Sequence, residues 1–251
     1  MESGSIAFDT SKIRAQVHEL FSKLAPVYDL GNDLISFGLH RTWKRSAIAA
    51  SGKLVPGAWM LDICTGTGDL AFLAKRMCPG ADVTGLDFSE SMLAVARKRV
   101  AKSSAEFRPG FVFGDATDLT GIPDSSVDLV TVAFGLRNIP ERQKAEREVA
   151  RVLRQDGAFV VLDLGRPVSP WLSPLFAFYF WIVMPIFSFF FTGDPKKYLW
   201  LIKSLKRFPR ERELAAELIG SGFGEVEVRR FFPGAVSLHI ARKRRTVEKE
   251  A

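Results

Sequence analysis

The stretch Trp59-Met-Leu-Asp62-Ile-Cys-Thr-Gly66-Thr-Gly68-Asp69 decides the fold of this chain. Its apolar beginning predicts a buried strand, and Thr-Gly-Thr-Gly predicts a tight turn in which the backbone passes close to another group. Apolar residues recur at helical spacing over 70–77, so a helix is expected after the turn. A strand, a glycine turn and a helix in this order are how an α/β domain presents backbone N–H groups to a nucleotide-like ligand.

Three acidic residues accompany three successive strand-like runs. Asp62 lies just before the glycine turn, Asp87 ends a run at 81–86, and Asp115 follows a run near 110–114. An acid placed like Asp87 accepts hydrogen bonds from both hydroxyls of a ribose. Asp62 is suited to hold an ammonium group, directly or through water, and Asp115 is suited to an exocyclic amine such as that of adenine. We therefore expect these acids to form a nucleoside site with the turn glycines, Gly66 and Gly68.

Residues 66–71 also fit the dinucleotide pattern G-x-G-x-x-G/A, so an NAD enzyme has to be weighed. The charge of Asp62, at the mouth of the first strand, counts against it because a pyrophosphate would be repelled there. Acids at the carboxyl ends of three strands suit a cationic nucleoside without phosphates. S-adenosylmethionine is such a molecule, and the residues favour it as the cofactor.

The rest of the chain continues the alternation of strands and helices, and its 251 residues suit one structural domain with additions. Further strands are expected at 127–133, 158–163, 224–232 and 235–242, and further helices at 89–102, 141–154 and 210–221. Pro233-Gly234 predicts a tight turn, so the final strand should run antiparallel at or near a sheet edge. The expected segments are a helical lid (1–55), a nucleotide-binding core (56–165), an aromatic insertion (166–209) and a closing segment (210–251).

The N-terminal part and one later loop supply the remaining candidate site residues. Helices are predicted at 9–24 and about 41–51, and the polar and aromatic stretch between them contains Tyr28 and His40. Because this part precedes the nucleotide fold, it is free to cover the ligand as a lid. Arg137 and Asn138 follow a predicted strand, and ligands of open parallel sheets lie outside the carboxyl ends of strands. Both side chains are therefore expected to face the site.

The composition excludes several classes of protein. The net charge of +7 is spread along the chain, which does not indicate a nucleic-acid partner, and its densest basic cluster is Arg242-Lys-Arg-Arg245 near the end. That cluster fits either a solvated tail or attraction to anionic lipid. The two cysteines, Cys64 and Cys78, lack the spacing of metal ligands, so we expect a reduced intracellular setting and no metal. The N-terminus lacks the pattern of a signal peptide.

One stretch, residues 171–192, departs from the pattern of a soluble domain. It has no charged residue and is long enough to be considered as a membrane span. Two prolines interrupt it, and a true span would separate the last two strands from their sheet. Ordinary core is one explanation, but so large an uncharged face favours a lipid-facing or prenyl-binding surface. We therefore expect a cytoplasmic protein in peripheral contact with the inner face of the membrane.

From Tyr28 to His239 the chain resembles the ubiquinone/menaquinone biosynthesis C-methyltransferase family. The family signature Y-D-x-M-N-x-x-[LIVM]-S-x-x-x-H-x-x-W is matched from Tyr28 to Trp43, except that Gly31 replaces the methionine. Cys64-Thr-Gly-Thr-Gly-Asp69 is similar to the family's C-G-T-G-D, and Phe134-Gly-Leu-Arg-Asn138 is identical to F-G-L-R-N. The departures, such as Asp163 in place of a glutamate, concern the substrate rather than the cofactor.

The resemblance implies a Rossmann-like class I methyltransferase. Such a fold is α/β, with a seven-stranded, mostly parallel sheet, an antiparallel final strand and helices on both faces. It also implies cofactor contacts at Thr67, Asp87, Asp115 and Ala116, to which we add Phe88 beside Asp87. The implied acceptor is a prenylated quinol, with demethylmenaquinol as the leading substrate and a benzoquinol precursor of ubiquinone as an alternative.

The expected chemistry assigns a role to each polar candidate. A quinol carbon becomes nucleophilic when its ring hydroxyl loses a proton, so the site needs a proton acceptor and a cation for the forming oxyanion. Arginine stays protonated, so Arg137 is expected to stabilise and orient the phenolate with help from Asn138. His40 or Asp69 is the expected proton relay through water, and Tyr28 is expected to orient the ring.

Two further functions stay open. A phospholipid or small-molecule N-methyltransferase would use the same donor, and a non-catalytic donor-binding subunit of a membrane complex would use the same fold. F-G-L-R-N and the N-terminal signature favour the quinol, and the intact polar set favours an enzyme. The sequence is compatible with a homo-oligomer but does not indicate one.

Overall fold

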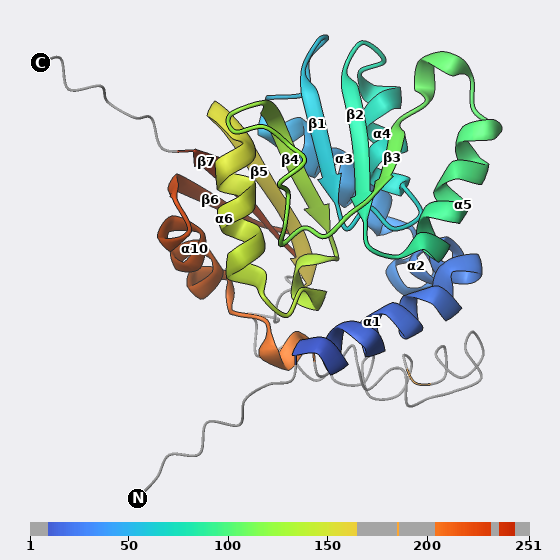
Figure 1. Ribbon diagram of the computed structural model, residues 1–251, viewed down its shortest axis with the longest axis horizontal. Coiled ribbons are helices and arrows are strands. Elements are labelled where there is room, and N and C mark those ends of the chain that lie inside the picture. The colour runs from blue at the N-terminus through green and yellow to red at the C-terminus, as the bar shows by residue number, and fades with distance from the viewer. Residues whose placement is uncertain (1–9, 165–184, 186–203, 232–235, 244–251) are drawn as a thin grey trace, which may run out of the picture.

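The computed structural model describes residues 10–164, 185, 204–231 and 236–243, and it centres on one seven-stranded sheet (Figure 1). The strand order is β3-β2-β1-β4-β5-β7-β6. The strands are β1 (Trp59–Ile63), β2 (Asp82–Asp87), β3 (Gly110–Phe113), β4 (Val127–Ala133), β5 (Leu153–Leu164), β6 (Phe223–Phe231) and β7 (Val236–Lys243). The first five pair in parallel, whereas β7 runs antiparallel to both β5 and β6. The predicted mostly parallel sheet with an antiparallel final strand is confirmed.

Helices cover both faces of this sheet, as expected. They are α1 (Thr10–Leu24), α2 (Tyr28–Ser36), α3 (Leu39–Ser51), α4 (Asp69–Met77), α5 (Glu90–Ala101), α6 (Arg142–Val152) and α10 (Glu211–Gly220). One face packs against α6 and α10, and the opposite face packs against α3 and α4 (Figure 1). The helices α1 and α2 lie across the carboxyl ends of the parallel strands. The predicted N-terminal lid therefore lies where the ligand of such a sheet would bind.

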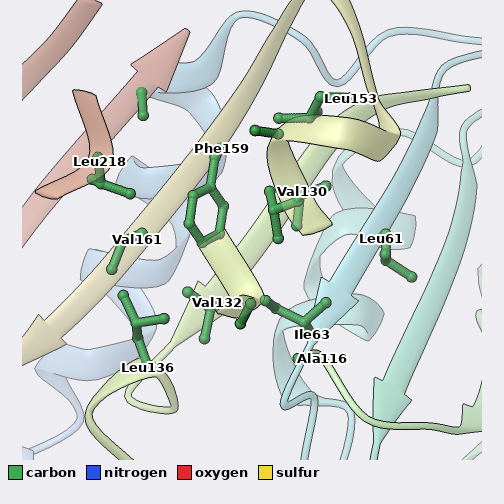
Figure 2. Packing of buried hydrophobic residues seen from close by; sticks show 14 of the residues in the cluster. Leu61, Ile63, Ala116, Val130, Val132, Leu136, Leu153, Phe159, Val161 and Leu218 are labelled. Atoms are coloured by element: carbon green, nitrogen blue, oxygen red, sulfur yellow. The ribbon is translucent and has the colours of Figure 1, made fainter. Parts of the chain in front are cut away.

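The 12-residue strand β5 shows why a continuous apolar run forms a buried strand. Its side chains alternate between the two faces: Phe159 and Val161 enter the core under α6 and α10 (Figure 2), and Val160 and Leu162 belong to the core that includes residues of α3 and α4. The ring of Phe159 stacks on that of Phe223 with centroids 5.8 Å apart. Burying a side chain of this size contributes about 1.5–3 kcal/mol, so this core fixes the sheet that carries the site.

Several predicted boundaries differ from the structure. The polar stretch after Pro26 forms the helix α2, which ends where Phe37 and Gly38 adopt left-handed conformations. The turn at Gly38 therefore ends a helix and is not part of a longer loop. Strand β5 begins at Leu153, before the predicted start. The final strand β7 is antiparallel and lies next to the edge strand β6, as predicted. Ser89, the first residue of the predicted helix, occupies the N-cap position of α5, and its side chain makes no capping hydrogen bond.

Other predictions fall on residues that the structure does not describe. These are the aromatic stretch 171–192 apart from residue 185, the Pro233-Gly234 turn and the end of the basic cluster, residues 244–245. Within the described ranges, no helix combines the length and the apolar character needed to cross a membrane.

The interface between α6 and α10 buries a carboxyl group next to another one. Glu146 is fully buried and accepts a hydrogen bond from Ser221 Oγ at 2.8 Å, while its Oε1 has no hydrogen-bond partner. Arg142 Nε lies 3.6 Å from Glu146 Oε1, but its hydrogen bonds go to Glu217, through two nitrogens at 2.6 and 2.9 Å. Burial and the neighbouring charge of Glu217 raise the pKa of Glu146 above its ordinary value of 4.5. The folded protein therefore favours the protonated form of this side chain.

This raised pKa predicts a loss of stability in alkaline solution. The stabilisation is fully present below the unfolded pKa and is lost as the pH rises through the folded pKa. Glu146→Gln keeps an acceptor for Ser221 without the charge, so its melting temperature should exceed that of the wild type by about 2–4 °C near pH 9, equivalent to roughly 1 kcal/mol. Near pH 5 the two should agree. Thermal unfolding followed by circular dichroism across this range measures the difference, and a constant offset would contradict the assignment.

Candidate functional site

A cavity of about 770 Å³, partly open to solvent, lies at the carboxyl edge of the parallel strands. Its walls come from α1, the start of α2, the glycine turn, and the loops that follow β2, β3 and β4. The lining residues are Arg14, Val17, Phe21, Tyr28, Cys64, Gly66, Asp87, Phe88, Met92, Asp115, Ala116, Thr117, Ala133, Phe134, Gly135, Asn138, Ile139 and Pro140.

The carboxylate of Asp87 fixes the glycine turn at one end of this cavity. Its Oδ2 accepts the backbone N–H of Gly66 at 2.7 Å, and its Oδ1 accepts that of Ser89 at 2.9 Å. Gly66 has a φ of +59°, a conformation that favours glycine. Burial raises the pKa of Asp87, while the backbone N–H groups oppose this rise. The strand end, the turn and the first residues of α5 are thus held together around an acid on the cavity wall.

Asp62 lies beneath the glycine turn and not on the described cavity wall. It is buried, and its two oxygens accept the hydroxyls of Thr65 at 2.6 Å and Thr131 at 2.7 Å. Burial raises its pKa to about 6, against the effect of these two hydroxyls. Each oxygen accepts one hydroxyl and keeps a further acceptor site, so contact with an ammonium group, directly or through water, stays a prediction. Asp62 also ties β1 and β4 to the turn.

The other two residues of the turn serve packing and the lid. Gly68 has a φ of +80°, and a Cβ placed there would lie 2.3 Å from the ring of Phe111, so a larger residue has no room. The hydroxyl of Thr67 donates to Asp29 of α2 at 2.6 Å, and Arg99 donates to the other oxygen of Asp29 at 3.0 Å. Among the described residues that form the cavity wall, neither Gly68 nor Thr67 appears. Their contacts join the glycine turn to the lid.

Arg14 was missed by the sequence analysis and closes the opposite end of the cavity. Its guanidinium binds Asp115 at 2.5 Å, the hydroxyl of Thr117 at 3.2 Å, and the carboxylate of Glu141. Asp115 was predicted to receive an exocyclic amine, and it lies on the wall beside Ala116. The same carboxylate therefore also holds α1 over the cavity. A single arginine within a helix carries no signal of this role, because the contact joins segments about a hundred residues apart in sequence.

Arg137 faces a buried carboxylate, although the sequence predicted that it faces the ligand. Its Nη1 binds Asp163 at 2.5 Å and the carbonyl oxygen of Phe134 at 2.6 Å, and its Nε has no hydrogen-bond partner. The side chain is 9% exposed and is absent from the described cavity wall, whereas its neighbour Asn138 lines it. The positive charge is already compensated by Asp163. Arg137 therefore shapes the loop after β4 and is not a free cation.

His40 and Asp69 form a second ionic group beside the cavity. His40 Nε2 lies 2.8 Å from Asp33, and its Nδ1 lies 3.9 Å from Asp69. Burial opposes ionisation of Asp69, but the nearby ammonium of Lys44, at 2.7 Å, outweighs it and lowers the pKa of Asp69 to about 2. An acid this strong is a poor proton acceptor, so the predicted relay through Asp69 does not fit. His40 is buried between two carboxylates and is not among the described wall residues.

Of the predicted catalytic residues, Tyr28 and Asn138 reach the cavity. The sequence analysis also missed wall residues whose signals were present. Cys64 and Phe134 adopt left-handed conformations with φ of +53° and +58°, and a Cβ on Gly135 would lie 2.6 Å from that of Cys64. The F-G-L-R-N loop and the glycine turn thus approach closely, which explains why glycine is required there. Burial, and then the nearby carboxylates, raise the pKa of Cys64, so this thiol stays neutral.

The chain matches the ubiE/COQ5 methyltransferase family over residues 9–243. It belongs to this family. It is 37% identical to the demethylmenaquinone methyltransferase of Staphylococcus aureus strain JH9 over 236 residues, which cover 94% of this chain and 96% of the relative. This is the family that the motifs resembled.

Solved structures support the fold at much lower identity. A Haloferax volcanii putative methyltransferase in complex with the Trm112 activator aligns with a TM-score of 0.65 and 16% identity, covering 90% of this chain and 98% of that one. Phosphoethanolamine N-methyltransferase 2 of Haemonchus contortus, solved with S-adenosylhomocysteine, aligns with a TM-score of 0.59 and 16% identity, covering 81% and 53%. The protein is an S-adenosylmethionine-dependent methyltransferase of class I fold.

The cavity has the features that such a cofactor needs. Asp87 ends β2, where a carboxylate binds ribose hydroxyls, and Asp115 lies at the end of β3 beside the apolar residues Phe88 and Met92. These side chains would hold the nucleoside, and the backbone of Gly66 would lie against its amino-acid part. When bound, the cofactor supplies a methyl group that is already activated as part of a sulfonium ion.

Arg14→Ala should speed the dissociation of S-adenosylmethionine about five- to tenfold. The substitution frees α1 from three partners at once, and partly exposed charged contacts of this kind are worth about 1 kcal/mol. Stopped-flow fluorescence of cofactor release measures the rate. Arg97→Ala is the matched control, because Arg97 forms an exposed pair with Glu90 on α5 away from the cavity wall. If cofactor release from Arg14→Ala is as slow as from the wild type, Arg14 does not hold α1 over the bound cofactor.

Proposed function

We propose that the protein transfers a methyl group from S-adenosylmethionine to a ring carbon of a prenylated quinol, with demethylmenaquinol as its substrate. The observation that carries this proposal is the 37% identity to a demethylmenaquinone methyltransferase over 94% of the chain. It is supported by the position of the F-G-L-R-N loop, whose residues Phe134, Gly135 and Asn138 line the cavity. The loop that the resemblance connects with quinol substrates thus borders the place where the cofactor binds.

The side chains around this loop suit a flat aromatic acceptor. Tyr28 and Phe21 form one wall with ring centroids 6.0 Å apart, and Phe134 and Ile139 lie across the cavity from the lid. Apolar walls exclude water from the reacting carbon, and the amide of Asn138 supplies a hydrogen-bonding group for a ring oxygen. Because the charge of Arg137 is compensated by Asp163, its role is to hold the loop that places Asn138 on the cavity wall.

Labelled S-adenosylmethionine tests the substrate. The purified protein is incubated separately with demethylmenaquinol, with a benzoquinol precursor of ubiquinone and with phospholipid, and the labelled product is identified by mass spectrometry. We expect label in menaquinol, with turnover at least tenfold above that on the benzoquinol. Label in phospholipid would select the N-methyltransferase alternative, and binding without transfer would select a non-catalytic subunit.

Arg137 and Asp163 are best tested together. Arg137→Ala alone leaves the buried Asp163 without its partner, which costs about 3–5 kcal/mol and threatens the fold. The double variant Arg137→Gln/Asp163→Asn removes both charges and keeps hydrogen-bonding groups at both positions. We expect it to bind the cofactor within about threefold of the wild type and to lose at least tenfold in turnover, or about 1.4 kcal/mol in activation free energy. Calorimetry and steady-state kinetics separate these quantities, and wild-type turnover would contradict a role in the reaction.

A further inference from the structure

Helix α2 exposes large apolar side chains that an ordinary surface helix would turn toward the core. Two of its polar side chains are engaged by neighbouring segments: Asp29 binds Thr67 and Arg99, and Asp33 binds His40 and Arg41. A surface helix normally turns its apolar stripe to the core and its polar residues to water. In α2 the acidic side chains Asp29 and Asp33 contact neighbouring segments, while large apolar side chains face outward.

These outward residues form one continuous apolar face. Leu30, Leu34 and Phe37 follow one another at the spacing of one helix face, and Leu39 comes just after the turn that ends the helix. Their exposed fractions are 55%, 40%, 83% and 47%. Phe37 stands at the tip of this turn with a φ of +52°, a strained conformation for an aromatic residue. Exposure of four large apolar side chains on one short segment indicates a surface that contacts another apolar phase.

The small size of this face decides against a second copy of the chain as its partner. Helix α2 has nine residues and is therefore about 14 Å long. One face of it offers far less than the ~800 Å² that each partner contributes to a stable protein interface. A lipid surface has no such requirement, because a few inserted apolar side chains combine with nearby basic residues. The matching basic residue is Arg45, which is exposed on α3, whereas the exposed Arg41 one turn earlier already binds both oxygens of Asp33.

We propose that the outward face of α2 and its terminal turn (Leu30, Leu34, Phe37 and Leu39) insert into the surface of an anionic bilayer. Arg45 contacts the lipid headgroups. Helix α2 begins at Tyr28, which lines the cavity, so insertion places the cavity mouth at the membrane surface. This inference rests on the proposed function in one respect: a prenylated quinol resides in the membrane, and docking through α2 gives it a direct route to the cofactor.

Vesicle binding of the full chain tests the insertion without reference to turnover. Sedimentation with vesicles of about 70 mol % phosphatidylcholine and about 30 mol % phosphatidylglycerol measures the partition coefficient of the wild type and of Leu34→Asp/Phe37→Asp. We expect the variant to bind at least tenfold more weakly and Arg45→Glu to lose binding to the anionic vesicles. Ile219→Asp is the matched control, because Ile219 is an exposed apolar residue, 48% exposed, on α10. This control should bind as the wild type does.

Three outcomes would overturn the proposed insertion of α2. Unchanged vesicle binding by Leu34→Asp/Phe37→Asp overturns it, and so does a lower melting temperature with binding unchanged, which would mean that another part of this chain covers the face. A wild type that does not bind vesicles but dimerises in analytical ultracentrifugation also overturns it. The variant should keep wild-type turnover on a short-chain, water-soluble quinol and lose turnover on vesicle-embedded quinol. Failure of the proposed function looks different, since no quinol would then be methylated by any form of the protein.

Discussion

Two buried carboxylates hold the glycine turn in the shape on which the site depends. Asp62 joins the turn to the two central strands through Thr65 and Thr131, and Asp87 binds the backbone N–H groups of Gly66 and Ser89. Each acid is kept in a poorly solvated position, where an unpaired charge would be strongly destabilising. These hydrogen bonds therefore fix the turn before any ligand arrives. The cost of ordering the turn on binding is correspondingly small.

The lid is attached to this arrangement by polar contacts and not by a deep apolar core. Arg14 connects α1 to Asp115 and Glu141, and Asp29 connects α2 to Thr67 and Arg99. Both attachments end at or next to residues that form the cofactor cavity. Partly exposed ion pairs are weak individually, so α1 and α2 can separate from the core more readily than the strands can separate from one another. Asp115 therefore both holds α1 over the cavity and forms part of the cavity wall.

Much of the fold could be predicted because its signals are local. The apolar run at 59–63, the glycine turn and the alternation that follows determine the parallel sheet, and Gly66 and Asp87 could be placed from spacing alone. The pairing of β7 with β5 joins strands that are distant in the chain, for which the sequence offers no local pattern. Helix α2 was missed because its acidic residues bind neighbouring segments, so that its composition resembles a loop.

The site was predictable in its chemistry but less so in the partners of its charges. Asp87, Asp115, Tyr28 and Asn138 line the cavity, as expected from strand ends and motifs. Arg137 and Asp69 are paired with Asp163 and Lys44, and such pairings depend on contacts that only the folded chain creates. The same holds for Arg14, whose partners lie about a hundred residues away. The motifs thus identify residues near the site, whereas the ionic partners seen in the fold determine whether a charged side chain is free to bind a ligand or exchange a proton.

A crystal structure of the protein with S-adenosylhomocysteine tests the central claim most directly. We predict that the ribose hydroxyls lie within hydrogen-bond distance of Asp87, that the adenine lies beside Phe88 and Asp115, and that Asp62 still binds Thr65 and Thr131. Ligand density outside this cavity, or a ribose that does not reach Asp87, would contradict the account.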